Sequence, residues 1–131
     1  MPDERFEDHL THPRGRGREV AGASHGAAGG AACGDLVRFS IAVEAEHVSA
    51  AGFEASGCGS MLAAGSAAVE LAEGAGLLEV ARIGSPQIAA ALGGLSAGKL
   101  HAADLVSDAM HRALGAAVRA ERAVHLSLIH I

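Results

Sequence analysis

Two stretches in the first half of the chain alternate apolar and polar residues and therefore predict β-strands. They cover about 36–43, where the sequence is Leu-Val-Arg-Phe-Ser-Ile-Ala-Val, and about 48–54. Successive side chains of a strand point to opposite faces, so this alternation is typical of a sheet with one buried face. A short turn near Glu46 and His47 joins the two stretches, which we expect to form an antiparallel hairpin.

Apolar residues at helical spacing, interrupted by glycines, dominate the second half of the chain. Ser60 is placed to cap the first of these helices, and Pro86 lies in the first turn of the third, where proline is favoured. A short helix before Pro13 is expected as well, whereas the Gly/Ala-rich segment 15–34 is expected to be a loop. The predicted helices are 3–12, 61–73, 77–83, 86–92 and 100–122.

The order of these elements, a hairpin first and helices after it, indicates an α+β domain. We expect a small antiparallel sheet packed on one face by several helices, in two layers. The 131 residues fit one domain, assigned to residues 1–125. Residues 126–131, Leu-Ser-Leu-Ile-His-Ile, look like the translation of a sequencing adapter, and a short apolar strand is the alternative interpretation.

Composition adds that the core must be built from small side chains. Half of the residues are hydrophobic, yet there is no Trp, no Tyr and only three Phe. Burial contributes roughly 25 cal/mol per Å² of apolar surface, and small side chains bury little surface each. We therefore expect helices and sheet to approach each other closely.

Net charge and the number of cysteines exclude some classes of function and indicate the cellular compartment. The formal net charge is −5, and the one basic cluster, Arg14, Arg16 and Arg18, is spaced by glycines and expected to be solvated, which disfavours nucleic-acid binding. The polar first 20 residues do not resemble a signal peptide, and no charge-free run of 18 apolar residues predicts a membrane span. Two cysteines without a secretory signal fit a reducing compartment, so a cytoplasmic protein is expected.

Three stretches carry residue types that bind metals. A glycine between Cys33 and Asp35 allows a tight turn that points a thiolate and a carboxylate at one place. Cys58 lies at the start of a predicted helix, whose positive end favours the thiolate, the form that binds metal. His101 offers an imidazole, a ligand that suits zinc and iron. Spacing alone leaves open the alternative of two buried cysteines and a surface histidine. The stretches are Cys33-Gly34-Asp35, Gly57-Cys58-Gly59 and Lys99-Leu100-His101.

These stretches, in this order, resemble the iron-sulfur cluster assembly scaffolds of the IscU and NifU N-terminal type. The similarity extends over about residues 5–118. Besides the three stretches above, it is carried by the N-terminal Asp8-His9-Leu10-Thr11-His12-Pro13-Arg14 and by Gly52-Phe53 with the small-residue segment Ser60-Met61-Leu62-Ala63-Ala64-Gly65-Ser66.

The resemblance implies the two-layer α+β fold and a binding protein rather than an enzyme. It implies that Cys33, Asp35, Cys58 and His101 surround a transient 2Fe-2S cluster, with Gly34, Gly57, Gly59 and Lys99 in supporting positions. The implied partners are a cysteine desulfurase, which supplies sulfur, and apo-proteins, which receive the cluster. Zinc at the same place and a homodimer are further possibilities that the family suggests.

The chain departs from the family pattern at three places. Ala102 stands where the family has its third cysteine, directly after the histidine, so four candidate ligands remain. Four ligands are enough for one tetrahedral metal. They are also enough for a two-iron cluster with two ligands per iron, or a second subunit could contribute ligands. Gly30-Ala31-Ala32 replaces an Asn-Pro before Cys33, and Leu95-Ser96-Ala97-Gly98-Lys99 keeps only the outer residues of the chaperone-binding Leu-Pro-Pro-Val-Lys.

Two alternative functions remain beside the scaffold. The first is a zinc-bound or degenerate relative with a structural or regulatory role, in which one closed four-ligand site has no redox chemistry. The second is a thiol enzyme in which His101 activates Cys58 and Asp35 orients the histidine. The enzyme is disfavoured because it leaves Cys33 without a role.

The remaining polar residues are assigned to structure or solvent. His9 and His12 are expected in a structural or docking segment, and Lys99 is expected to be exposed or to pair with Asp35. A helical face is predicted to be polar and solvated rather than a second metal site. It consists of Asp104, Asp108 and His111.

Overall fold

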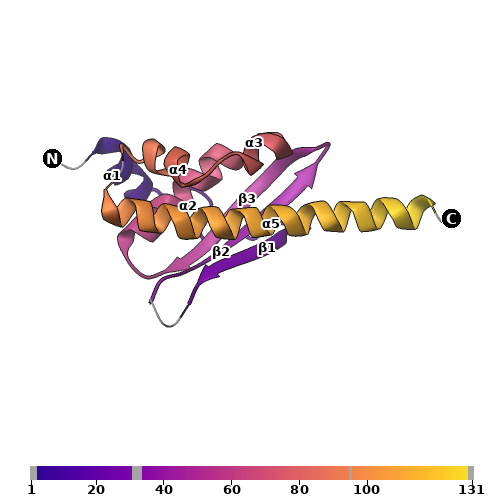
Figure 1. The fold of residues 1–131 in the computed structure, drawn as a ribbon, viewed down its shortest axis with the longest axis horizontal. Coiled ribbons are helices and arrows are strands. Elements are labelled where there is room, and N and C mark those ends of the chain that lie inside the picture. The colour runs from indigo at the N-terminus through magenta and orange to yellow at the C-terminus, as the bar shows by residue number, and fades with distance from the viewer. Residues whose placement is uncertain (1–2, 31–33, 95, 130–131) are drawn as a thin grey trace.

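The computed structural model describes residues 3–30, 34–94 and 96–129. The three strands form one antiparallel sheet in the order β1-β2-β3, with α5 packed on β1 and β2 and α2 packed on β3 (Figure 1). This confirms the two-layer α+β fold. The elements are α1 (Glu4–Thr11), β1 (Ser24–Gly29), β2 (Leu36–Glu44), β3 (His47–Ser56), α2 (Gly59–Ala72), α3 (Leu77–Ala81), α4 (Ser85–Ala91) and α5 (Ala97–Ile129).

The predicted hairpin is present as β2 and β3. Its register pairs Leu36 with Ser56 at the open end and Glu44 with His47 beside the turn. The apolar side chains Val37, Phe39 and Ile41 of β2 are fully buried, because their alternation places all three on the face that the helices cover.

The segment 15–34 is not all loop, which corrects the sequence prediction. Residues Ser24–Gly29 form β1, which pairs antiparallel with β2 from Ser24↔Ile41 to Gly29↔Leu36. Its sequence, Ser-His-Gly-Ala-Ala-Gly, has neither β-branched nor aromatic residues, so local propensity gives no strand signal. The strand exists because β2 offers a hydrogen-bonding edge and α5 covers it.

Close approach of α5 to β1 depends on Gly26. A Cβ at this position would overlap the Ala109 carbonyl oxygen and the Ala113 backbone nitrogen of α5. The alanines of α5 that face the sheet are themselves buried, so a helix backbone lies almost directly on a strand backbone. The expected close packing of small residues is therefore present.

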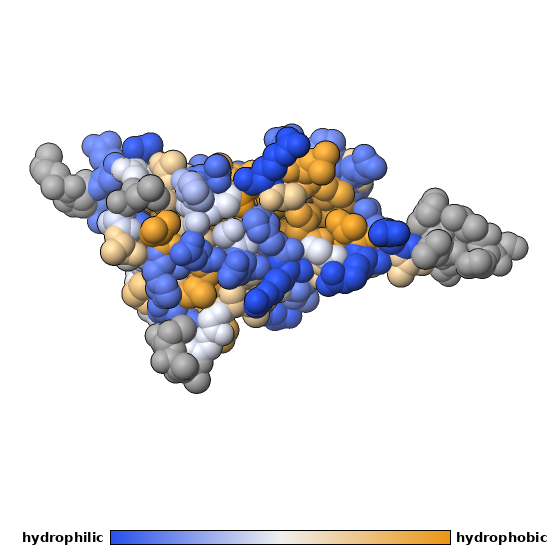
Figure 2. All heavy atoms as spheres, viewed as in Figure 1, coloured by the Kyte–Doolittle hydropathy of each residue, from blue (hydrophilic) through white to orange (hydrophobic). Residues whose placement is uncertain are grey.

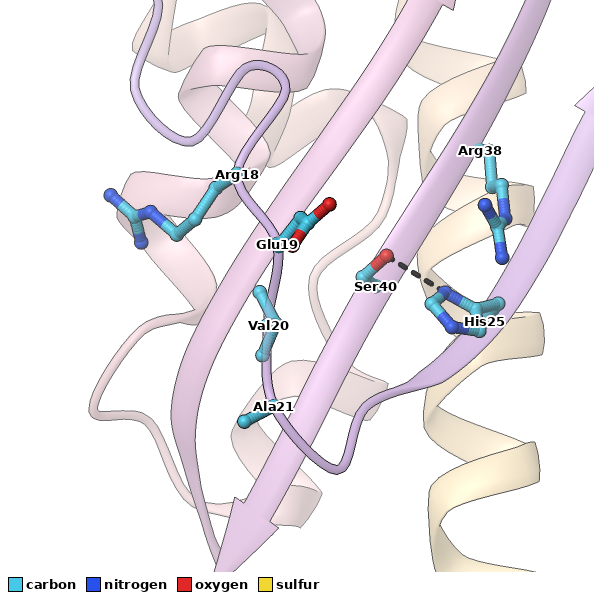
Figure 3. A pocket seen from close by; sticks show the side chains of 7 residues that line it. All are labelled: Arg18, Glu19, Val20, Ala21, His25, Arg38 and Ser40. Atoms are coloured by element: carbon cyan, nitrogen blue, oxygen red, sulfur yellow. Dashed lines mark hydrogen bonds between the residues drawn. The ribbon is translucent and has the colours of Figure 1, made fainter.

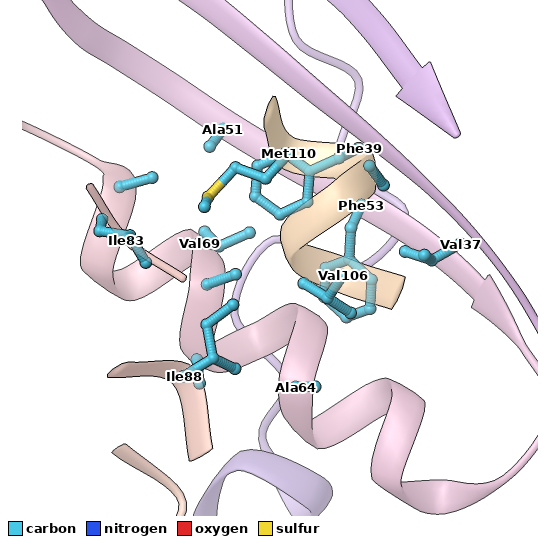
Figure 4. Packing of buried hydrophobic residues seen from close by; sticks show 14 of the residues in the cluster. Val37, Phe39, Ala51, Phe53, Ala64, Val69, Ile83, Ile88, Val106 and Met110 are labelled. Atoms are coloured by element: carbon cyan, nitrogen blue, oxygen red, sulfur yellow. The ribbon is translucent and has the colours of Figure 1, made fainter. Parts of the chain in front are cut away.

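The core lies between the sheet and the helices α2, α4 and α5 (Figure 4). Phe39 and Phe53 come from the sheet, Met61 from α2, Ile88 from α4 and Met110 from α5. These few larger side chains fill the space that the many buried alanines leave. Core residues from every layer thus belong to one cluster.

Helix boundaries differ from the predictions, and the differences in α2 and α5 bear on the site. Helix α2 begins at Gly59 with Cys58 as its N-cap residue, so Ser60 lies inside the helix. Helix α5 runs from Ala97 to Ile129, longer than the predicted 100–122, and residues 126–129 are helical rather than a strand. The adapter origin of residues 126–131 stays a prediction. No helix in the described part of the chain is both long and apolar enough to cross a membrane.

A buried hydrogen bond fixes the N-terminal helix to α2. His9 is 5% exposed, and its Nδ1 lies 2.7 Å from the Ser66 hydroxyl, which also accepts the Arg14 backbone N–H at 2.8 Å. The Arg14 guanidinium bonds the Asp8 carboxylate at 2.6 Å and lies 3.3 Å from Glu70. The segment is structural, as predicted for His9.

The surroundings of His9 lower the pKa of its ring. Burial, the largest cause, lowers the pKa of His9 from its usual 6.5, and Arg14 acts in the same direction, while Glu70 and Asp8 oppose it. Arg14 in turn lowers the pKa of Asp8 through their hydrogen bond. Protonation of His9 would therefore place a charge where it is poorly solvated.

Gly26→Ala is expected to destabilise the fold. The added methyl group meets backbone atoms of α5, which cannot rotate away, so we expect a loss of about 1–3 kcal/mol in the free energy of unfolding, typical of overpacking. Denaturant unfolding followed by circular dichroism measures it. Gly30→Ala is the matched control, since its Cβ meets no atom within 4 Å. Equal stability of the two variants would show that α5 does not need Gly26.

Acid is expected to weaken the fold through His9. Because the pKa is lower in the folded state than in the unfolded chain, this contribution is complete above the unfolded pKa and is lost as the pH falls through the folded one. The denaturant concentration at the unfolding midpoint is measured at about pH 7.5 and at about pH 5.5. We expect the decrease between the two to be larger for the wild type than for His9→Gln. His12→Gln, which changes an exposed imidazole, should keep the wild-type dependence. A pH dependence untouched by His9→Gln would contradict this role.

Candidate functional site

Three of the four predicted ligand residues meet at the open end of the hairpin. Leu36 pairs with Ser56, so Asp35, just before β2, lies beside Cys58, just after β3. Helix α5 begins at the same end and brings His101 in its second turn. A loop, a helix N-terminus and a second helix thus supply one side chain each.

Asp35 connects the other two residues. Its Oδ1 accepts the Cys58 backbone N–H at 3.3 Å, and its Oδ2 lies 3.4 Å from the His101 Nε2. The Asp35 side chain is 16% exposed and that of His101 is 54% exposed, so the carboxylate is largely covered while the imidazole is reachable. One oxygen therefore holds the Cys58 turn, and the other faces the imidazole.

Gly57 allows this turn to form. Its φ is +125°, and a Cβ here would overlap the Asp35 carboxylate. A side chain at residue 57 would therefore push the Cys58 turn away from Asp35. The Cys58 thiol is exposed, and Cys58 makes no side-chain capping hydrogen bond to α2. The thiol is consequently available to a ligand arriving from solvent.

The other supporting residues have different roles. Gly34 has a φ of +74° beside Asp35, and Gly59 begins α2, where its Cα faces Leu10 of α1. Lys99 does not pair with Asp35: its ammonium donates to the Leu92 carbonyl at 3.1 Å and lies 5.0 Å from the centre of the Phe6 ring. Lys99 therefore ties α5 to α4 and α1.

The fourth predicted ligand, Cys33, lies outside the described residues. Among the residues that are described, no three His, Cys, Asp or Glu side chains are grouped as a metal site. Ala102, which follows His101, is fully buried, so its methyl group belongs to the core rather than to the exposed donor set. The described donors are therefore one thiol, one carboxylate and one imidazole.

Sequence reasoning missed two apolar residues beside the site. Leu36 and Leu100 are 46% and 39% exposed, and they adjoin Asp35 and His101 in the sequence. Their periodicity marks them as ordinary members of a strand and a helix, so no local signal singles them out.

The predicted polar face of α5 is only partly solvated. Asp104 and Asp108 are exposed, as expected. His111 turns inward, and its buried Nε2 has no hydrogen-bond partner in the described chain. It lines a hollow of about 380 Å³ between α3 and α5, beside the apolar surface that Figure 2 shows near α3. The second metal site stays disfavoured, because the histidine is separated from the carboxylates.

Comparison with known sequences gives one consistent result. Residues 3–122 match the family described as NifU-like N terminal domain. A bifunctional protein NifU/MnmA of Rubrobacter xylanophilus is 47% identical over 112 residues, which is 83% of this chain and 23% of that protein. An iron-sulfur cluster assembly scaffold protein, IscU 1 of Archaeoglobus fulgidus, is 33% identical over 114 residues, 87% of this chain and 74% of that protein.

Solved structures share the fold. A proposed iron-sulfur cluster assembly scaffold protein for the SUF system of Fervidobacterium islandicum gives a TM-score of 0.64 at 14% identity, covering 86% of this chain and 95% of that one. The N-terminal part of a NifU-like protein of Brucella abortus gives 0.53 at 15% identity, covering 92% and 91%.

Proposed function

Because the chain belongs to the family of NifU-like N-terminal domains, we propose that it is a scaffold for iron-sulfur cluster biogenesis. It receives iron and sulfide, holds a nascent 2Fe-2S cluster at Cys33, Asp35, Cys58 and His101, and passes the cluster to apo-proteins. It acts as a carrier rather than as an enzyme. The observation that supports this most directly is the meeting of Asp35, Cys58 and His101 at one exposed end of the fold.

The donor set suits a cluster that must leave again. Thiolates are soft ligands that hold iron-sulfur clusters firmly, whereas carboxylate and imidazole are harder donors. Cys58 supplies an exposed thiol, and His101 and Asp35 already lie next to each other. With Ala102 in place of a third cysteine, the set holds two thiols, so at least half of the ligation comes from harder donors. A second copy of the chain is an additional source of ligands.

The surroundings of the site suit contacts with proteins. Leu36 and Leu100 expose apolar surface beside the ligands. A cysteine desulfurase that delivers sulfur and an apo-protein that takes the cluster both have to reach the same exposed residues. We propose the cytoplasm as the compartment, since thiolate ligands require reducing conditions.

Reconstitution tests the proposed cluster. Under anaerobic conditions, iron, cysteine, a cysteine desulfurase and a thiol reductant, which converts the persulfide sulfur to sulfide, should yield near-equal iron and sulfide and charge-transfer absorption bands. Cys58→Ser and Cys33→Ser should each lose the bands, because each removes one of two thiolates. His101→Ala should weaken them, whereas His47→Ala, which removes an exposed imidazole at the other end of the hairpin, should not. Zinc bound without sulfide would contradict cluster assembly and favour the zinc-bound alternative.

Cluster release tests the role of the harder donor. Asp35→Ala is expected to slow transfer to an apo-ferredoxin, on the order of tenfold, as is common when the surroundings of metal ligands change. Iron and sulfide content measured before transfer separates slow release from poor assembly. Glu121→Ala, which removes an exposed carboxylate far from His101 on α5, is the matched control. Transfer from Asp35→Ala at the wild-type rate would count against the carboxylate as the labile ligand.

A further inference from the structure

The sheet has a second face, which carries polar residues instead of helices. Arg38 and Ser40 alternate with the buried Val37, Phe39 and Ile41 along β2, so both point away from the core. His25 of β1 is paired with Ser40 in the sheet register, and its Nδ1 lies 2.9 Å from the Ser40 hydroxyl. This hydrogen bond fixes the imidazole on the outer face.

The segment 14–21, which follows α1, forms one wall of a hollow on this face. It pairs with β3 through two hydrogen bonds, Gly17 N–H to the Phe53 oxygen at 2.8 Å and Phe53 N–H to the Gly15 oxygen at 3.0 Å. It then passes over Gly52, where a Cβ would lie 3.0 Å from the Arg18 oxygen. The Arg14–Ser66 bond anchors the segment at its start.

Between this wall and β1 lies a hollow of about 520 Å³ (Figure 3). In Figure 3 the Arg38 side chain bends toward His25 on one side of Ser40, while Glu19 lies on the other side. The residues that line it are Arg18, Glu19, Val20, Ala21, His25, Arg38 and Ser40.

Arg38 differs from the other arginines near this face. The Arg18 guanidinium donates to the Glu73 carboxylate at 3.0 Å and to the Ala51 carbonyl at 2.9 Å, and Arg16 lies 3.9 Å from Glu54. The Arg38 side chain makes no hydrogen bond or ion pair within the described ranges. A guanidinium with five free N–H donors thus stands beside an imidazole whose Nε2 is also free for a ligand.

We propose that this hollow binds an oxyanion, the carboxylate or phosphate group of a small molecule. The planar guanidinium of Arg38 matches two oxygens of either group, and charge-assisted pairs of this kind are the strongest hydrogen bonds available to a side chain. The hydrogen-bonded pair of His25 and Ser40 contributes one further donor, the His25 Nε2–H in one tautomer or the Ser40 hydroxyl in the other. The Glu19 carboxylate disfavours ligands of high negative charge. None of these residues belongs to the proposed cluster site. The oxyanion site can therefore be tested independently of the scaffold function.

The test is an NMR titration of the whole chain with two probes, inorganic phosphate and acetate, at constant ionic strength. The Arg38 side-chain Nε–H and the His25 ring signals should shift and saturate. Arg38→Ala should weaken binding by about tenfold or more. Arg82→Ala removes the same charge from an exposed position on the helical side and should leave the affinity unchanged. A higher affinity for one probe identifies the source of the oxyanion.

Two further variants distinguish a loss of binding from a loss of the fold. Arg38→Lys keeps the charge and loses the planar fork, so it should weaken binding while the backbone spectrum stays native. Glu19→Gln removes the opposing carboxylate and should strengthen binding, an effect that damage to the fold does not produce. Shifts that never saturate, equal losses in Arg38→Ala and Arg82→Ala, or no gain in Glu19→Gln would overturn the proposal.

Discussion

The contact between two backbones, α5 against β1 at Gly26, is the constraint on which the rest of the structure depends. Alanine and glycine bury little surface each, so the sheet and helices gain stabilisation only by approaching closely enough for many small contacts to form. Gly26 permits that approach where α5 crosses the edge strand. It also sets how closely the middle of α5 lies on the sheet, and His101 lies two turns before that contact on the same helix.

Given that framework, Asp35 organises the candidate site. The hairpin register places it beside Cys58, the missing Cβ of Gly57 admits its carboxylate, and α5 delivers His101 to its second oxygen. One carboxylate thus orients a helix N-terminus and contacts an imidazole at the same time. The three residues are positioned by secondary structure that is itself held in place by the core.

The sequence predicted the hairpin, the helices and three residues that the structure brings together, because period-two alternation, glycine stops and short motifs are local signals. It missed β1, whose small residues become a strand only through β2 and α5. It also missed the pairing of His9 with Ser66, which joins residues 57 positions apart. Cys33 lies outside the described residues, so its place among the ligands stays a prediction.

Ala102 has a consequence for how this site can change over evolutionary time. Asp35, Cys58 and His101 are held by loops and helix ends, but residue 102 is a fully enclosed part of the hydrophobic interior. A cysteine there would have to fit its sulfur into a closely packed interior, where an added heavy atom typically costs about 1–3 kcal/mol. Gaining a cysteine at residue 102 therefore carries a packing cost that changes at the exposed residues Cys58 and His101 do not.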